Sequence, residues 1–468
     1  MNVFTFFKSR ATSIYLSTLI LYLLQIALKY YSLPYALTAY LLGGLAIFFL
    51  VFSVPQLRGT VRFLVFFMLV AGSLMFVASG KGLPDFLLGL QDMVNLLCIL
   101  MVIELAGFPI SMMDLKPLFR PLVDSTRNPI FFYWILSLCA MVLGAVINLA
   151  IVPIIYYAVW DTLQEKGLHD PRAMGNSIKR GVALALFWTP LGIMMAITLE
   201  YSGVLWLEMV PVLFPLTALA LVISLFSDFL QAKKEGKRVG PARDRTQVPG
   251  LGSFFWATFF PLAFYVLVLM ACVLFLNTIA GLGMIDTLII TAVSIPFAWS
   301  FLRGERKQVA KRTRDHFQQK VPRLGQPFSL FLAAGIFAQG LRSFGFEALV
   351  DHVLLFLLDY LGAVGIVMVI VFTIVMLSWV GVHQMVSLVI IGQNINFDSG
   401  IMPPLFYAMA MMLGGSFANL TSPISAITLI ISSYFNRSPF EVGLRWNAIF
   451  VALFLISVPF FLLLFLTV

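Results

Sequence analysis

Residues 138–155 read LCAMVLGAVINLAIVPII, and residues 374–391 read IVMLSWVGVHQMVSLVII. Both stretches consist of an apolar arm, a glycine followed by a polar residue, and a second apolar arm. The central residues are Gly144 and Asn148 in the first stretch, and Gly381 and His383 in the second. Glycine inside an apolar run favours a break in the helix. We therefore expect two helical hairpins, at 129–158 and 361–391, each entering and leaving a membrane on the same side.

A second interrupted run follows each hairpin. The sequences are GVALALFWTPLGIMMA at 181–196 and LGGSFANLTSPISAIT at 413–428. Proline in mid-helix removes a backbone donor, and freed backbone groups at membrane depth occur where protein buries them or where they line a wet cavity. Matched interruptions in two halves of a chain are a sequence indicator of a transporter binding site. We expect helix breaks at Gly144, Pro190, Gly381, Gly414, Gly415 and Pro423.

The composition indicates lipid as the solvent for most of the chain. Of 468 residues, 61% are hydrophobic and 11% are charged, and the mean hydropathy is +0.99. Soluble domains carry about 25% charged residues. A helix needs roughly 20 apolar residues to cross a bilayer, and continuous apolar runs favour helices over a β-barrel. Eleven runs have this length: 11–33, 35–54, 62–79, 86–106, 174–199, 204–227, 255–278, 281–302, 327–343, 403–432 and 446–467.

Lysine and arginine indicate the orientation, because short cytoplasmic loops carry an excess of both. With a cytoplasmic N-terminus and two returning hairpins, only Lys29, Lys81 and Arg342 of the 30 cations lie outside. If both hairpins crossed instead, the best split would be about 20 against 10. The count favours a re-entrant run at 129–158. It decides little for the run at 361–391, because only two cations follow it.

These patterns predict an all-α membrane protein with about 11 transmembrane helices plus two re-entrant helical hairpins in two inverted repeats. The expected parts are a leading helix at 1–34, repeat 1 at 35–228 with a broken helix at 174–199, a basic cytoplasmic linker at 229–253, and repeat 2 at 254–468 with a broken helix at 403–432. The N-terminus is expected in the cytoplasm and the C-terminus outside a cell inner membrane.

In this arrangement the chain resembles the ion transporter superfamily, which includes divalent-anion/sodium symporters, citrate transporters and arsenite-efflux permeases. The resemblance covers nearly the whole chain, with a hairpin between the third and fourth span of each repeat. It places interfacial amphipathic helices at 108–128 and 344–360, and it implies a homodimer. The symporters carry a Ser-Asn-Thr triplet at the site. This sequence lacks the triplet, and its nearest analogue is the segment 416–423.

Polar residues at the expected breaks are the candidate substrate-binding residues: Asn148, Thr189, His383, Ser416, Asn419, Thr421, Ser422 and Ser425. Helix N-termini there suit a carboxylate or an oxyanion, while free carbonyls suit Na⁺. A Na⁺ ion would bind backbone groups of Gly144, Asn148, Gly381 and Asn419. The alternative is that the hydroxyls bond backward to helix carbonyls. His383 either accepts a coupling proton or shapes the hairpin tip as a neutral residue.

Other charged residues are expected near the ends of spans. These are the acids Asp92, Glu104, Glu208 and Asp286, and the pair Lys179 and Arg180 at the start of a broken helix. The basic pair either draws an anion toward the site or only sets orientation. The basic loops at 229–252 and 303–326 are expected to set orientation and to touch anionic lipid. Cys98, Cys139 and Cys272 are far apart, so neither a disulfide framework nor a metal cluster is expected.

The predicted function is secondary active transport of a small anionic solute by an elevator-like motion, coupled to Na⁺ or H⁺. No ATP-binding or hydrolase motif is present, so we expect neither an enzyme nor a cofactor, and no nucleic-acid partner. Two alternatives stay open. A membrane-embedded enzyme acting on a lipid-linked substrate would need clustered acids or histidines at one interface and a large loop. A channel would conduct faster than a carrier.

Overall fold

The fold consists of helices throughout the part of the chain that the structure describes. The computed structural model describes residues 3–115, 118–119, 128–165, 167, 169–234 and 253–466, and no strand occurs in these ranges. The helices are α1 Val3–Tyr30, α2 Ala36–Ser53, α3 Gly59–Ala78, α4 Leu83–Val102, α5 Phe108–Ser111, α7 Pro129–Ile147, α8 Ile151–Glu165, α9 Pro171–Trp188, α10 Ile193–Ser202, α11 Trp206–Lys234, α12 Ser253–Leu274, α13 Met284–Arg303, α14 Arg306–Asp315, α15 Gly325–Ser343, α16 Phe346–Val380, α17 Gln384–Asn394, α18 Pro404–Thr421, α19 Ala426–Phe435 and α20 Ala448–Leu466. A 3-10 segment, Ile103–Gly107, joins α4 to α5, and a π-helical segment, His316–Lys320, follows α14.

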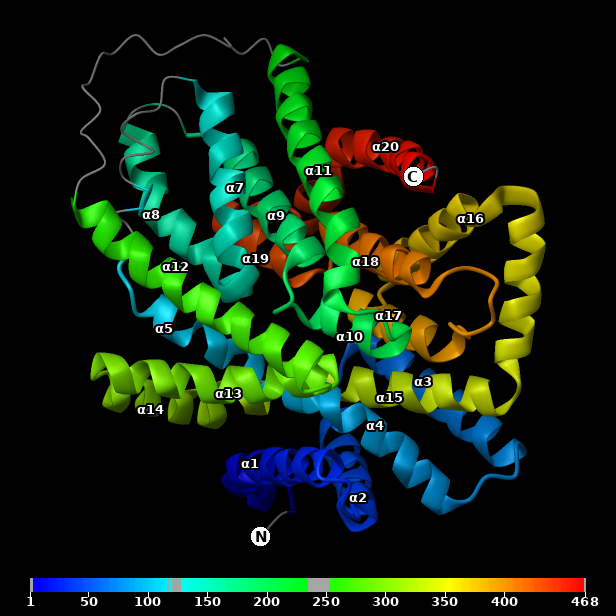
Figure 1. Ribbon diagram of the computed structural model, residues 1–468. Helices are drawn as coiled ribbons and strands as arrows, with labels where there is room; N and C mark the ends of the chain where they lie inside the picture. Colours follow the sequence, from blue (N-terminus) through cyan, green and yellow to red (C-terminus); the bar gives the residue numbers. More distant parts are fainter. Residues whose placement is uncertain are drawn as a thin grey trace.

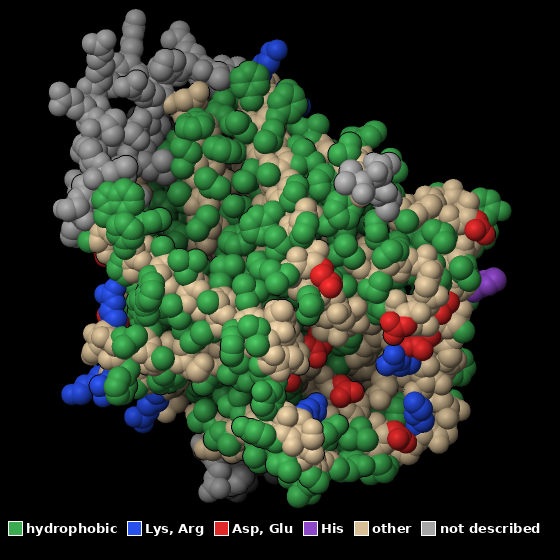
Figure 2. All heavy atoms as spheres, in the orientation of Figure 1, with side chains coloured by type: hydrophobic (Ala, Val, Ile, Leu, Met, Phe, Trp, Pro, Cys, Tyr) green, Lys and Arg blue, Asp and Glu red, His purple; other side chains and the backbone are tan. Residues whose placement is uncertain are grey.

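The helices have the length and the surface of membrane spans. Thirteen helical stretches among the described residues are long and apolar enough to cross a bilayer. Large apolar side chains such as Phe63, Leu302 and Leu464 point outward and are strongly exposed. Apolar atoms cover most of the face seen in Figure 2. Because water disfavours such a surface and lipid does not, the chain is an all-α, multi-pass membrane protein.

The helices form two bundles, which Figure 1 shows largely one above the other. The straight-helix bundle contains α1–α5 and α12–α15, with α15 packed against α2, α3 and α4. The hairpin bundle contains α7–α11 and α16–α20. In the straight-helix bundle α3 and α15 cross at Gly72 and Gly340, where a Cβ on Gly340 would lie 2.5 Å from the carbonyl oxygen of Gly72. Glycine is therefore required for this close crossing.

The first hairpin turns back at Asn148. This residue follows α7 and has φ 53° and ψ −131°, a backbone conformation that asparagine adopts more readily than most residues. After the turn, α8 runs back beside the start of α7, and the backbone N–H of Asp170 donates to Tyr133 Oη at 3.0 Å. Residues 129–158 are thus not one continuous rod.

The broken helix that follows packs parallel to α7. Along the contact, the Thr189 hydroxyl donates to the carbonyl of Ala145 at 3.0 Å, and Gly181 packs against the backbone of Ser137. The helix α9 ends at Trp188, four residues including Pro190 are non-helical, and α10 continues the path.

The second hairpin has the same form. Its first helix, α16, is kinked at Gly362, which has φ 65° and ψ 179°, and the chain turns at Gly381, which has φ 112°. The part of α16 before the kink stands at the edge of the molecule in Figure 1 and covers nearly the same residues as the segment 344–360, whose interfacial position stays a prediction. After the turn, α17 leads to the start of α18, where the rings of Phe397 and Tyr407 pack 5.5 Å apart.

Equivalent hydrogen bonds join hairpin and broken helix in both halves. The Ser422 hydroxyl donates to the carbonyl of Ser378 at 3.3 Å, as Thr189 does to Ala145. Each pair is 44 positions apart in the chain. The second pair follows the first by 233 positions (378 minus 145, and 422 minus 189). In both halves the hydroxyl also accepts the backbone N–H two residues further along. The two halves therefore repeat the same local structure.

The sequence pattern pairs the two breaks correctly, Pro190 with Pro423 at an offset of 233, but it pairs the hairpin tips four and two positions out of register. It paired Gly144 with Gly381 and Asn148 with His383, whereas the offset of 233 pairs Asn148 with Gly381. The recurring feature is a positive φ at the turn, which a glycine supplies in one half and an asparagine in the other. Matching glycine to glycine missed this equivalence.

Three predicted helix breaks are wrong. Gly144 lies inside α7, and Gly414 and Gly415 lie inside α18. These glycines permit close packing: a Cβ would lie 2.6 Å from Ile374 Cδ1 at Gly414 and 2.5 Å from Met194 Cε at Gly415. The remaining predicted breaks lie in non-helical connections, at Pro190, Gly381 and Pro423.

Several predicted boundaries shift by a few residues because helices continue past the apolar run. The first hairpin extends to Glu165, the broken helices cover 171–202 and 404–435, and the start of the predicted linker 229–253 belongs to α11. Residues 235–252 of that linker, and residues 116, 117 and 120–127 of segment 108–128, lie outside the described residues.

Candidate functional site

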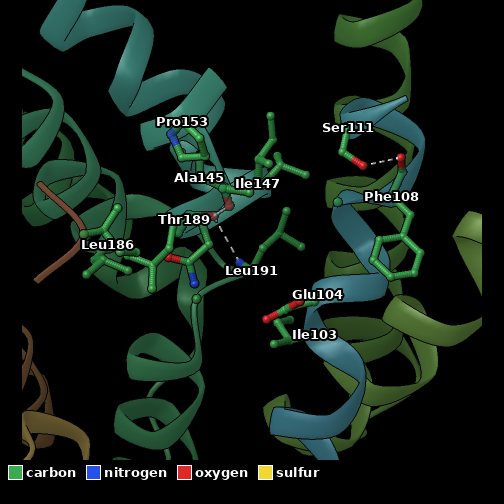
Figure 3. A pocket seen from close by; sticks show the side chains of 18 of the residues that line it. Ile103, Glu104, Phe108, Ser111, Ala145, Ile147, Pro153, Leu186, Thr189 and Leu191 are labelled. Atoms are coloured by element: carbon green, nitrogen blue, oxygen red, sulfur yellow. Dashed lines mark hydrogen bonds between the residues drawn. The ribbon is translucent and has the colours of Figure 1, made fainter. Parts of the chain in front are cut away.

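A cavity of about 560 Å³ lies between the two bundles. On the hairpin bundle it is lined by the first hairpin tip, residues 144–150, and by the break at Thr189, Leu191 and Gly192. On the straight-helix bundle it is lined by residues between Ile103 and Ser111, and by Arg312 and Lys320. Figure 3 shows the two walls facing each other, with Thr189 and Leu191 on one side and Glu104 and Ser111 on the other.

The hairpin wall contributes two of the predicted binding residues. Asn148 is exposed at the tip, where its positive φ makes it the point of reversal. Thr189 is buried, and its hydroxyl already bridges the carbonyl of Ala145 and the N–H of Leu191. The amide of Asn148 is therefore the better placed of the two to meet a solute.

The opposite wall contains the ionic side chains. Lys320 Nζ lies 2.7 Å from Glu104 Oε2. The guanidinium of Arg312 donates to Ser111 Oγ at 2.8 Å, and that hydroxyl donates to the carbonyl of Phe108. The sequence analysis treated the loop 303–326 only as an orientation device. Two of its cations line the cavity, since α14 and the π-helical segment fold back against α5.

The hydroxyls clustered at the second break mainly form hydrogen bonds to backbone carbonyls of the break itself. Ser425 donates to the carbonyl of Asn419 at 3.0 Å, and Thr428 donates to that of Ser422 at 3.0 Å. Trp379 Nε1 donates to Thr421 Oγ1 at 3.1 Å. The bonds from Ser425 and Thr428 satisfy carbonyls that the interruption at Pro423 leaves without helical partners. They favour the alternative in which the hydroxyls bond to backbone.

The other predicted residues of the second half lie away from the cavity lining. Ser416 Oγ is buried with no hydrogen-bond partner among the described residues. His383 caps the N-terminus of α17, where its Nδ1 accepts the N–H of Met385 at 3.4 Å. A ring nitrogen that accepts carries no proton, so this contact supports the neutral, tip-shaping role. The structure brings Asn148 and Thr189 together in one cavity and leaves His383, Ser416, Asn419, Thr421, Ser422 and Ser425 outside it.

The basic pair of α9 is buried away from the cavity, which disagrees with the predicted role of drawing an anion toward the site, while the predicted role in orientation stays a prediction. The Arg180 side chain is 1% exposed, and Nη1 lies 2.7 Å from Asp228 Oδ1. Its Nε donates to Asn447 Oδ1 at 3.1 Å, and Lys179 Nζ donates to the carbonyl of Val442 at 3.2 Å. These bonds tie α9 to α11 and to the segment before α20. The pair therefore stabilises the hairpin bundle and does not line the cavity.

The structure agrees in part with the prediction that the four acids lie near the ends of spans. Asp286 lies in the first turn of α13 and accepts the Tyr22 hydroxyl at 2.6 Å. Glu208 lies in the first turn of α11, and Glu104 follows α4. Asp92, by contrast, lies in the middle of α4.

Comparisons with known proteins add no family assignment. No protein-family model matches the chain, and no curated protein matches it. The resemblance to the ion transporter superfamily stays a prediction from the sequence.

Proposed function

We propose that the chain is a secondary active transporter that carries a small anionic solute by moving the hairpin bundle past the straight-helix bundle. The observation that supports this most is the pair of equivalent interruptions, one in each half, of which the first lines a cavity between the bundles. Discontinuous helices at a repeat interface are where many transporters bind their substrates and coupling ions.

The groups around the cavity suit an anion. Arg312 raises the local concentration of anions by its positive potential, while the charge of Lys320 is paired with that of Glu104. Asn148 offers an amide donor beside the start of α8, where helical N–H groups carry partial positive charge. Carbonyl oxygens at the two turns are the proposed ligands for a coupling Na⁺ ion, and H⁺ is the alternative coupling ion.

The cavity lies at the end of the molecule that carries the cations of residues 303–323. Because cationic loops face the cytoplasm, this end is assigned to the cytoplasmic side of a cell inner membrane, and the structure to an inward-facing state. The N-terminus is then cytoplasmic and the C-terminus external. The proposal also includes a homodimer, which rests on the family resemblance alone.

Uptake into proteoliposomes tests the proposal. A panel of organic and inorganic anions, with and without Na⁺ and pH gradients, should reveal saturable uptake driven by one gradient. Asn148→Gly removes the side-chain amide, while glycine tolerates the positive φ of this position, and the variant should reduce uptake at least fivefold. Asn436→Gly is the matched control, since Asn436 also has a positive φ but lies outside the cavity. Flux that never saturates would indicate a channel, and no flux with any anion would refute the proposal.

A further inference from the structure

The cavity carries one uncompensated positive charge. Lys320 and Glu104 form an ion pair at 2.7 Å and neutralise each other. Arg312 has a neutral partner, the hydroxyl of Ser111, and no carboxylate partner among the described residues. A single anionic group placed beside Arg312 would balance the cavity. A second anionic group would meet no unpaired cation among the described residues that line the cavity, so it would gain no ion pair there.

The wall opposite Arg312 is apolar. Ile147, Leu149, Leu186, Leu191 and Ile430 line it together with the tip backbone. The polar side chains of the hairpin bundle there are Asn148, Thr189 and Tyr434, and the Thr189 hydroxyl is already paired. In Figure 3 the labelled side chains of this wall are almost all hydrocarbon, while the carboxylate of Glu104 lies across the gap. An occupant would therefore contact charge on one side and hydrocarbon on the other.

The size of the cavity also exceeds that of a small hydrophilic anion. A volume of about 560 Å³ falls within the range of roughly 300–1,000 Å³ typical of sites for ligands with a substantial carbon skeleton. A small dianion would leave the apolar wall unfilled.

We propose that the cargo is an amphipathic organic monoanion, a carboxylate or sulfonate with an apolar body of about six to ten carbons. This inference rests on the proposed transport function. The anionic group binds at Arg312, and the apolar body lies against the hairpin tip, which carries it when the hairpin bundle moves.

Binding to the purified full-length protein in nanodiscs tests the inference. The probes are hexanoate, octanoate, the dianions adipate and suberate, and neutral octanol. Affinity should rise about two- to fourfold for each added methylene, because each buried CH₂ contributes transfer free energy. Suberate and octanol should each bind at least tenfold more weakly than octanoate. Equal or tighter binding of the dianions would overturn the inference.

Four variants locate the charge. Arg312→Gln should weaken octanoate binding about tenfold, and Arg312→Lys should restore most of it. The control is Arg306→Gln, because the Arg306 guanidinium stacks on the exposed ring of Phe301 outside the cavity. Glu104→Gln frees the charge of Lys320, so the ratio of suberate to octanoate affinity should rise. An unchanged ratio, or an equal effect of Arg306→Gln, would refute the assignment.

Flux measurements separate this inference from the transport proposal. Uptake of adipate but not of octanoate would keep the transporter and overturn the cargo class. Octanoate that binds with the predicted dependence on Arg312, yet is never carried, would keep the site and refute transport. Occupation of the cavity by a phospholipid that octanoate cannot displace would overturn the cargo class as well.

Discussion

Replacing Thr189 by valine tests the equivalence of the two halves. Valine has nearly the same shape as threonine but lacks the hydroxyl, so the bonds of 3.0 Å to the carbonyl of Ala145 and 3.2 Å from the N–H of Leu191 are both lost. A buried hydrogen bond contributes about 1 kcal/mol net, and an unpaired buried group costs more. We expect Thr189→Val to lower the free energy of unfolding by about 2 kcal/mol. Ser422→Ala should have a similar effect, because its hydroxyl makes the same two bonds.

Thr198→Val is the matched control. Thr198 is fully buried, and its hydroxyl has no hydrogen-bond partner among the described residues. Removing an unpaired buried hydroxyl should leave stability unchanged or raise it by up to about 1 kcal/mol. Reversible unfolding in mixed detergent micelles, followed by circular dichroism, measures both variants. Equal destabilisation by the two valines, or no loss with Thr189→Val, would refute the assigned role of the hydroxyl bridge.

Two further stability predictions use the same assay. Asp228→Asn leaves the buried Arg180 without its carboxylate and should lower the free energy of unfolding by about 3 kcal/mol. Glu347→Gln breaks an exposed pair with Arg342 and should lower it by less than about 1 kcal/mol. Equal losses of stability would show that the Arg180 pair is not buried. Gly381→Ala forces φ 112° on an L-residue and should lower the free energy of unfolding by about 2 kcal/mol. Gly44→Ala in α2 should be neutral or stabilising, because a Cβ there meets nothing within 4 Å. A neutral Gly381→Ala would contradict the turn geometry.

The helices and two of the breaks could be predicted because their causes are local. A continuous apolar run of about 20 residues has one stable form in lipid, and proline interrupts a helix whatever surrounds it. This holds for Pro190 and Pro423, both of which lie in non-helical connections. The register of the hairpin tips was missed because the turn has a positive φ at an asparagine, Asn148, in one half and at a glycine, Gly381, in the other.

The candidate site was predicted less well than the helices, because the side chains that surround each of its residues come from distant parts of the chain. Arg180 is buried only because Asp228 and Asn447 meet it, 48 and 267 positions away. Arg312 belongs to a basic stretch of the kind that orients membrane proteins, and nothing in its neighbouring residues indicates that α14 folds against α5. In the second half, a hydroxyl-rich sequence suggested binding, whereas most of these hydroxyls satisfy carbonyls at the break.

A cross-link between the bundles tests the central claim, that the hairpin bundle moves past the straight-helix bundle. A Cβ on Gly107 would lie 3.6 Å from the Cα of Ile147. The two Cα atoms are therefore at most about 5.1 Å apart, within disulfide range. The measurement uses Gly107→Cys with Ile147→Cys in a chain whose native cysteines, Cys98, Cys139 and Cys272, are replaced by alanine.

The account predicts that oxidation forms this disulfide and stops uptake into proteoliposomes, and that reduction restores it. Each single cysteine variant should transport equally well before and after oxidation, which controls for damage by the oxidant. Full transport by the oxidised, cross-linked double variant would contradict the account, because a hairpin tip fixed to the straight-helix bundle could not carry a solute past it.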